Sequence, residues 1–300
     1  MYKQVYGIIE TLAPVHIGAT AGEENGNLNL IFRDQFTQTG IINGSSIRGR
    51  LRADMRQYRQ LLEVQKSKDD KIEIPPDLDE NIWYGKKAVQ GVPDGTSEAL
   101  IKLEHASIVW LPVFCPGQPI VWVSCPSLLE RYQRIAKISV EPPQEYRSSK
   151  YLLNALKSQS NTKDLANKQI LFFNLGFITI DPPQNEEEQE KQQEQFEAYL
   201  PTRKNLPAII VNDNDMAVIH DMALYRQSRV ALEEDMKKAK RGAFFNVEAL
   251  PEKTILVFPI AIKPTDKQWK PIDGTTEGDI YLGGLESIGF GHCSLTIKGL

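Results

Sequence analysis

The chain has 300 residues, of which 41% are hydrophobic, so it can bury a core as one elaborated domain or as two ordinary ones. Its formal net charge is −4, which gives no overall basic field. Any nucleic-acid partner must therefore be held by a local patch.

The cysteines and the apolar segments argue against a disulfide-rich, zinc-binding, secreted or membrane-spanning protein. The cysteines, Cys115, Cys125 and Cys293, form no C-x-x-C pair, so they predict neither a disulfide framework nor a zinc site. The first residues lack the pattern of a secretory signal, and no apolar stretch is long enough to cross a bilayer. We therefore expect a cytoplasmic protein with buried free thiols, and no membrane partner.

The first third of the chain predicts strands followed by one long helix. Residues 3–12 favour a strand that stops at a proline, residues 19–29 a loop, and residues 30–32 and 40–42 two short strands. The apolar spacing of residues 47–65 predicts an amphipathic helix, with Ser45 and Ser46 as N-cap residues.

The rest of the chain alternates strand patterns with polar stretches. The expected elements are a surface insertion of limited structure over 66–100, strands over 101–114 and 118–124, a helix opening at Ser127, a strand over 172–181, a charged insertion over 184–200 as a solvated helix or flexible excursion, a charged helical stretch over 213–240, and strands over 254–262 and 293–297. This pattern predicts an α+β fold with helices on one face of an antiparallel sheet.

A row of arginines follows the start of the long helix. Small residues at 44–46 and 49 would let a phosphate approach the helix N-terminus, where N–H groups are unpaired. The alternative is a solvated basic helix face. The candidate RNA-binding residues of this segment are Ser45, Ser46, Arg48, Arg50, Arg52 and Arg56.

A glycine-rich loop near the end of the chain is the second candidate site. The stretch 282–291 holds Gly283, Gly284, Gly289 and Gly291, which can present backbone N–H groups to phosphates. A tight hairpin or bulge would need the same residues. His16 follows the first strand and is a further candidate RNA-binding residue, which could act as an acid or base on a ribose hydroxyl, although no titratable partner is evident nearby. The alternative is a structural histidine. No two histidines lie at metal-ligand spacing.

Three segments, 12–18, 44–52 and 283–291, together resemble the RAMP superfamily of CRISPR-associated proteins. Two more, 111–126 and 242–251, resemble the repeated backbone subunit of type III effector complexes, of the III-B branch or a related III-D variant. The resemblance implies a single RAMP domain over 1–300, with an RRM-like (ferredoxin-like) palm and a hairpin thumb from about 213–243. It also implies a ribonucleoprotein of antiviral defence whose partners are CRISPR RNA, target RNA paired with the guide, and related RAMP subunits.

One departure from the family pattern concerns catalysis. Cleaving members carry an aspartate in the loop after the first strand, whereas this chain has Asn27-Leu28-Asn29 at the corresponding place. An amide cannot serve as a general base. Asp34 is the nearest acidic candidate, but the family pattern has a second acidic residue at that place, which implies a structural role.

These observations lead to one main hypothesis and three alternatives. The main one is a non-cleaving or weakly cleaving backbone subunit that holds guide RNA and kinks the guide–target duplex, without a cofactor. The alternatives are a metal-dependent endoribonuclease that uses Asp34 and Mg²⁺, a guide-processing nuclease that uses His16, and a protein-interaction module without RNA.

Overall fold

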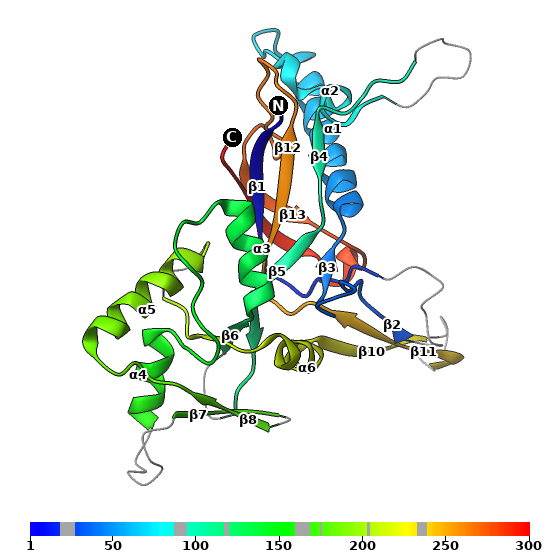
Figure 1. Ribbon diagram of the computed structural model, residues 1–300. Coiled ribbons are helices and arrows are strands. Elements are labelled where there is room, and N and C mark those ends of the chain that lie inside the picture. The colour runs from blue at the N-terminus through cyan, green and yellow to red at the C-terminus, as the bar shows by residue number, and fades with distance from the viewer. Residues whose placement is uncertain are drawn as a thin grey trace.

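The computed structural model describes residues 1–18, 28–86, 95–116, 120–159, 169–174, 176–202, 205–232 and 239–300. Within these residues the architecture is α+β, built around a mostly antiparallel sheet (Figure 1). The path of this sheet is β13-β14-β1-β12-β5-β6-β9, while β3 pairs with β5 and β4 with β12. Its strands are β1 (Lys3–Thr11), β3 (Ile41–Ile42), β4 (Ile101–Leu103), β5 (Ala106–Val113), β6 (Val121–Ser124), β9 (Ala208–Ile210), β12 (Ile255–Ile262), β13 (Glu277–Tyr281) and β14 (His292–Lys298).

The four inner strands of the sheet are arranged as in a ferredoxin-like fold. β14, β1, β12 and β5 lie side by side, and each neighbouring pair is antiparallel. Helix α1 (Gly44–Lys66) connects the region of β1 to β5, as the first helix does in a ferredoxin-like β-α-β-β-α-β unit. The expected ferredoxin-like palm is therefore present.

Both faces of the sheet are covered. In β1, Val5 and Ile9 pack into the core that contains α1, while Ile8 packs into a second core with α3 (Pro126–Ala136). This is the two-residue period of a strand buried on both sides. The prediction of helices on one face only was wrong, because a strand such as β5, which is buried along its whole length, needs apolar cover on each side.

A loop replaces the second helix of the ferredoxin-like unit. Residues 263–291, all of which the structure describes, contain no α-helix between β12 and β14. Instead Trp269 and Ile272 enter the main core, where they are 2% and 4% exposed. A folded loop thus does the packing that a helix would otherwise do.

The predicted surface insertion over 66–100 is more ordered than expected. It contains the short helices η1 (Pro76–Leu78) and α2 (Glu80–Tyr84), and α2 packs against α1. Trp83 and Tyr84 are fully buried in the main core, and the Trp83 indole donates to the carbonyl of Asp77 at 2.7 Å. Residues 87–94 lie outside the described part of the chain.

The charged insertion over 184–200 is a helix with one buried side. In α5 (Glu186–Tyr199), Phe196 and Tyr199 are fully buried in the second core, and the Trp110 indole donates to the Tyr199 carbonyl at 2.7 Å. Acidic and amide residues cover its other sides, so the solvated-helix interpretation holds for those sides only. Neighbouring elements are α4 (Lys150–Gln159) and the hairpin of β7 (Gln169–Phe173) and β8 (Gly176–Ile180), where the sequence predicted a single strand.

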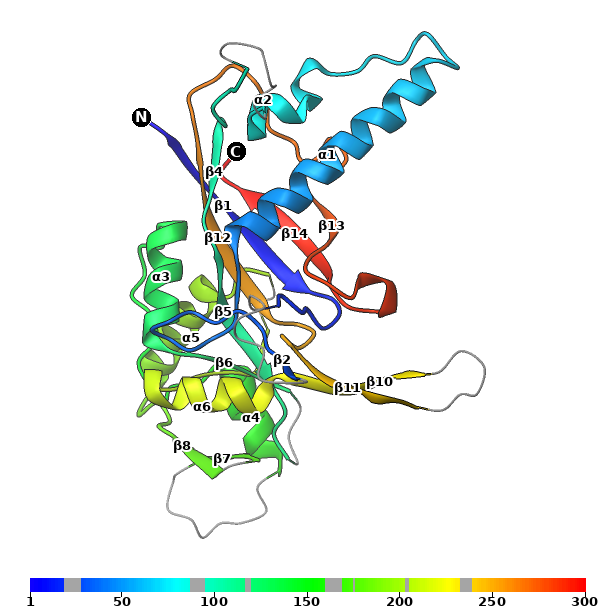
Figure 2. The ribbon, with the colours of Figure 1, turned by 90° about the vertical axis from the view of Figure 1, so that its right-hand side faces the viewer.

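A β-hairpin projects from the palm where the sequence predicted helix (Figure 2). Helix α6 (Asp213–Ala223) ends at residue 223, and β10 (Tyr225–Leu232) then pairs with β11 (Ala239–Ala249). The short β2 (Leu28–Asn29) adds to β11 in parallel. The sequence of residues 225–232 has no regular alternation of polar and apolar residues, so no local period marked this strand. Residues 233–238 lie outside the described part.

No helix in the described part of the chain combines the length and the apolar character needed to cross a membrane. The cysteines Cys115, Cys125 and Cys293 are free and buried, as predicted. Burial raises the pKa of the Cys115 thiol to about 12, so this thiol is inert near neutral pH.

The loop that replaces the second helix gives a test of stability. We expect Trp269→Ala to lower the free energy of unfolding by about 3–5 kcal/mol, because it leaves a cavity under a closed sheet. Urea unfolding followed by circular dichroism measures this change. Phe36→Ala is the matched control, since Phe36 is 91% exposed and its loss should change stability by less than about 0.5 kcal/mol. Equal effects of the two substitutions would refute a core role for Trp269.

Candidate nucleic-acid interface

The structure brings three of the recognised segments together beyond the end of β1. The N–H of Gly284 donates to the His16 carbonyl at 3.0 Å, and the N–H of Gly291 donates to the Pro14 carbonyl at 2.9 Å. Arg50, in the second turn of α1, lies 3.8 Å from the Glu286 carboxylate. Segments separated by more than 200 residues in the chain thus meet at one place.

The glycines of the loop 283–291 have two different functions. Gly283 has φ +88°, and a Cβ there would lie 2.2 Å from the His16 carbonyl oxygen, so close contact between two backbones requires glycine. Gly289 has φ +93°, but no atom lies within 4 Å of the position that a Cβ would take there. The space beside Gly289 is therefore open, although its N–H donates to the Glu286 carbonyl at 3.1 Å, whereas Gly283 joins the loop to the palm.

The loop is anchored by an aromatic side chain that the sequence analysis did not single out. Phe290 is 4% exposed and packs with Val247 and Ala249 at the base of the β10–β11 hairpin. Tyr225 meets the ring edge to face, with 5.9 Å between ring centroids. The guanidinium carbon of Arg229 lies 5.5 Å from the centroid of the same ring. Arg229 was missed because only its strand period, once β10 is known, places it beside the loop.

The start of α1 differs by a turn from the prediction. Asn43 is the N-cap, without a side-chain capping bond, and the helix begins at Gly44. Ser45 and Ser46 therefore lie in the first turn and are not N-cap residues. Ser45 is exposed and Ser46 is half-buried, and the Ser46 N–H donates to the Asn43 carbonyl at 3.1 Å, while no backbone acceptor among the described residues takes the Ser45 N–H. The helix start remains suited to an anion.

Most of the arginine row contacts the protein itself. Arg48 donates to the Tyr84 carbonyl at 2.5 Å, and Arg52 donates to the Gly85 carbonyl at 3.0 Å. Arg56 pairs with the buried Glu80 at 3.1 Å. These side chains join α1 to α2, and Arg56 is also exposed to solvent. Arg50 alone of the predicted arginines turns toward the glycine loop, although Asp54 also holds it.

His16 is held in one orientation by the hairpin. It is 8% exposed, and its Nδ1 lies 2.6 Å from the Glu248 carbonyl oxygen. A carbonyl only accepts, so Nδ1 carries the proton and Nε2 is left as an acceptor. No carboxylate or second base is bonded to His16 within the described residues, which leaves general acid–base catalysis without a partner.

Below His16, the side chain of Glu248 is the centre of an ion-pair cluster. This carboxylate, 3% exposed, lies 3.3 Å from Arg33 and 3.0 Å from Arg226. Asp221 pairs with both arginines at 3.0 Å. The cluster joins α6, both hairpin strands and the segment after β2, so it fixes the direction in which the hairpin leaves the palm.

Asp34, the candidate acid, stabilises a turn. Its Oδ1 accepts from the backbone N–H groups of Phe36 at 2.9 Å and Thr37 at 2.8 Å, and from the Thr37 hydroxyl. Burial raises the pKa of Asp34, but these hydrogen bonds outweigh it and the pKa is lowered overall. Residues 19–27, which include Asn27, lie outside the described part. In the part that is described, no group of three His, Cys, Asp or Glu side chains is placed to hold a metal ion.

The other histidines are less isolated than the sequence suggested. His292 pairs with Asp279 at 2.9 Å and stacks on Tyr281. His220 is fully buried beside the ion-pair cluster, and its Nε2 accepts from the Gly40 N–H at 2.8 Å. Burial, assisted by Arg33, lowers the pKa of His220 to about 3. His220 is therefore neutral in the folded protein near neutral pH.

His220 gives a pH-dependent prediction. The unfolded chain binds a proton at about pH 6.5 and the folded chain does not, so the stability held above that pH falls as the pH drops from 6.5 toward 3. We expect a slope of about 1.4 kcal/mol per pH unit from this residue. Urea unfolding of the wild type and of His220→Gln across this range isolates the contribution. Parallel pH profiles for the two proteins would contradict it.

The palm, the projecting hairpin and the glycine loop define a ferredoxin-like protein with an added arm. The model of the RAMP superfamily matches residues 8–294, so the chain belongs to the RAMP superfamily. No curated protein sequence matches the chain.

Solved structures of similar fold cover the whole chain. A crystal structure of Cmr4 has 19% identity and a TM-score of 0.59, over 99% of this chain and 100% of that one. An oligomeric Cmr4 from Pyrococcus furiosus has 18% identity and a TM-score of 0.60, over 100% of each chain. A chain of the type III-B Cmr-beta bound to cognate target RNA has 17% identity and a TM-score of 0.60, over 98% of this chain and 96% of that one. At such identities the likeness is one of fold.

Proposed function

We propose that this protein is a backbone subunit of a type III CRISPR RNA-guided surveillance complex. In this function it binds the CRISPR RNA backbone, its hairpin kinks the guide–target duplex, and its site leaves the target uncut. Its partners are CRISPR RNA, target RNA paired with the guide, and other effector subunits, including related RAMP subunits. Sequence is read by base pairing and not by the protein.

The observation that carries the proposal is the agreement in fold over the full length. Structures of Cmr4 and of a Cmr-beta complex bound to cognate target RNA align over at least 98% of this chain, including its hairpin. A shared fold alone does not assign a function. The convergence of His16, the glycine loop and the α1 start on one surface supplies the local chemistry.

The site offers the groups that an RNA backbone needs. The exposed first turn at Ser45 presents a hydroxyl and a backbone N–H, and the open space beside Gly289 leaves room for an RNA backbone. Arg229 adds positive charge beside the loop, and Arg50 reaches it as well, although Asp54 and Glu286 pair with Arg50. The Nε2 of His16 can accept from a ribose 2′-hydroxyl. Arg48, Arg52 and Arg56 act indirectly, because they hold α1 in place.

The proposal that this subunit leaves the target RNA uncut is supported by the state of its candidate acidic residues. Asp34, the nearest candidate, is committed to a turn through three hydrogen bonds. The place of the family aspartate is occupied by Asn27-Leu28-Asn29. Mg²⁺ would be required only if the subunit were a nuclease.

Arg229 tests the RNA-binding surface. We expect Arg229→Gln to weaken guide RNA retention regardless of guide sequence and to lower the slope of log K against log salt by about 0.7, the value for one phosphate contact on a single strand. Filter binding at several salt concentrations measures both quantities. Arg134→Gln, an exposed arginine on α3, is the control. Unchanged affinity and slope in Arg229→Gln would count against this surface.

Target cleavage is tested in the assembled complex. We expect labelled RNA complementary to the guide, with Mg²⁺, to be bound and to show no cut opposite this subunit. Asp34→Asn keeps an oxygen acceptor for the turn and removes the charge, so it should change neither binding nor cutting. Cuts opposite this subunit that disappear in Asp34→Asn would establish the endoribonuclease alternative instead.

A further inference from the structure

A lysine-lined pocket lies at the opposite end of the sheet from the glycine loop. It is formed where β1 begins and where β12 and β14 end, and its volume is about 610 Å³, within the usual range for ligand sites. β1 spans nine residues, so about 26 Å of strand separates this end from the other. The pocket is therefore distinct from the proposed RNA surface.

The charges of this pocket differ from those of the chain as a whole. Acidic residues outnumber basic ones in the sequence, 39 to 35, yet no Asp or Glu is among the described residues that line the pocket. The lysines that line it are Lys3, Lys263, Lys267, Lys270 and Lys298, and they come from three separate parts of the chain. A concave surface whose charged side chains are all positive focuses an attractive potential on anions.

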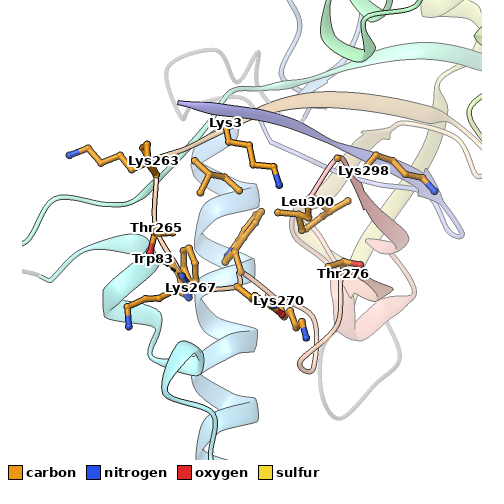
Figure 3. Close-up of a pocket in the computed structure, with 15 residues that line it drawn as sticks. Lys3, Trp83, Lys263, Thr265, Lys267, Lys270, Thr276, Lys298 and Leu300 are labelled. Atoms are coloured by element: carbon orange, nitrogen blue, oxygen red, sulfur yellow. Dashed lines mark hydrogen bonds between the residues drawn. The ribbon is translucent and has the colours of Figure 1, made fainter. Parts of the chain in front are cut away.

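The lysines differ in how far other residues neutralise them. Lys263 pairs with Glu98, and Lys267 lies 3.8 Å from Asp77. Lys3, Lys270 and Lys298 are exposed, and the described residues provide no ion pair for them. Figure 3 shows lysines around the pocket, with the amino group of Lys3 directed inward and Lys263 and Lys298 extending to either side. Three positive charges are thus available to a ligand.

The walls of the pocket are fixed before any ligand binds. Trp83 and Trp269 form a buried floor, and the backbone N–H of Gln268 donates to the Asp77 carboxylate at 3.0 Å. The N–H of Lys263 donates to the Leu100 carbonyl at 2.8 Å. The hydroxyl residues Thr265 and Thr276 add hydrogen-bonding groups to the lining. Little backbone ordering is then required on binding.

We propose that this pocket binds phosphate groups, carried either by single-stranded RNA or by a free polyphosphate. All the cations here are lysines, which hold phosphate as mobile point charges, whereas carboxylates are held best by the planar fork of arginine. The site is independent of the proposed function, because it shares no residue with the glycine-loop surface.

The test uses the full chain and two probes, inorganic triphosphate and a short fluorescein-labelled poly-uridine RNA. The pocket variant is Lys3→Gln with Lys270→Gln and Lys298→Gln. The control, matched in charge, is Lys137→Gln with Lys150→Gln and Lys191→Gln, which are exposed lysines of α3 to α5. Urea unfolding verifies that both variants are folded.

We expect the pocket variant, and not the control, to lose triphosphate binding and to bind RNA more weakly, because the glycine-loop surface is retained. With RNA its salt slope should fall by about 2, so its affinity should change between 50 and 200 mM salt by roughly 20-fold less than that of the wild type. Loss with both probes identifies RNA as a source, and loss of triphosphate binding alone identifies a free polyphosphate. Either result supports the site. If Arg229→Gln still weakens RNA binding when it is added to the pocket variant, the pocket is separate from the proposed RNA surface.

Two results would overturn the proposal. One is equal binding by the pocket variant, the control and the wild type with both probes. The other is unchanged phosphate binding together with lost self-association in light scattering, which would assign the lysines to an acidic protein surface on a second copy.

Discussion

The position of β1 between β12 and β14 is the constraint on which the rest of the structure depends. β1 is paired on both edges and packed on both faces, so its end point is fixed in three dimensions. At that end the Thr11 hydroxyl donates to the Pro251 carbonyl at 2.7 Å, and the Thr254 N–H donates to the same hydroxyl at 2.9 Å. The chain therefore leaves the sheet in a single direction toward His16.

The direction in which the chain leaves β1 determines which segments meet at the candidate interface. Val15 and Leu250 exchange two backbone hydrogen bonds of 2.9 Å, which brings the base of the hairpin to the segment 14–16. Gly283 then lets the glycine loop approach the His16 carbonyl, and Phe290 joins the loop to the hairpin. The surface proposed to hold RNA is thus a junction of rigid elements, and this suits positioning better than it suits acid–base chemistry.

The arginines of α1 show how one residue pattern can serve two purposes. In the sequence they form a basic row that would suit phosphates. In the structure Arg48 and Arg52 satisfy carbonyls at the end of α2, where helix C-terminal oxygens have no intrahelical donor. Arg56 and Arg59 pair with Glu80, a buried carboxylate that would be unfavourable alone. Of the α1 arginines that the sequence singled out, Arg50 alone reaches the glycine loop, and Arg229 of the hairpin adds positive charge there.

The sequence by itself determined the class of fold, the long helix α1 and the segments that meet at the interface. Those features rest on local patterns, namely the periods of apolar residues and the backbone freedom of glycine. Only the tertiary structure decided that β10 and β11 form a hairpin, that helices cover both faces of the sheet, and that most of the arginine row bonds to groups of the same chain. It alone gathered Lys3, Lys270 and Lys298 into one pocket. The reason is that partners far apart in the chain determine these outcomes, and no local period records which partner a charged side chain will meet.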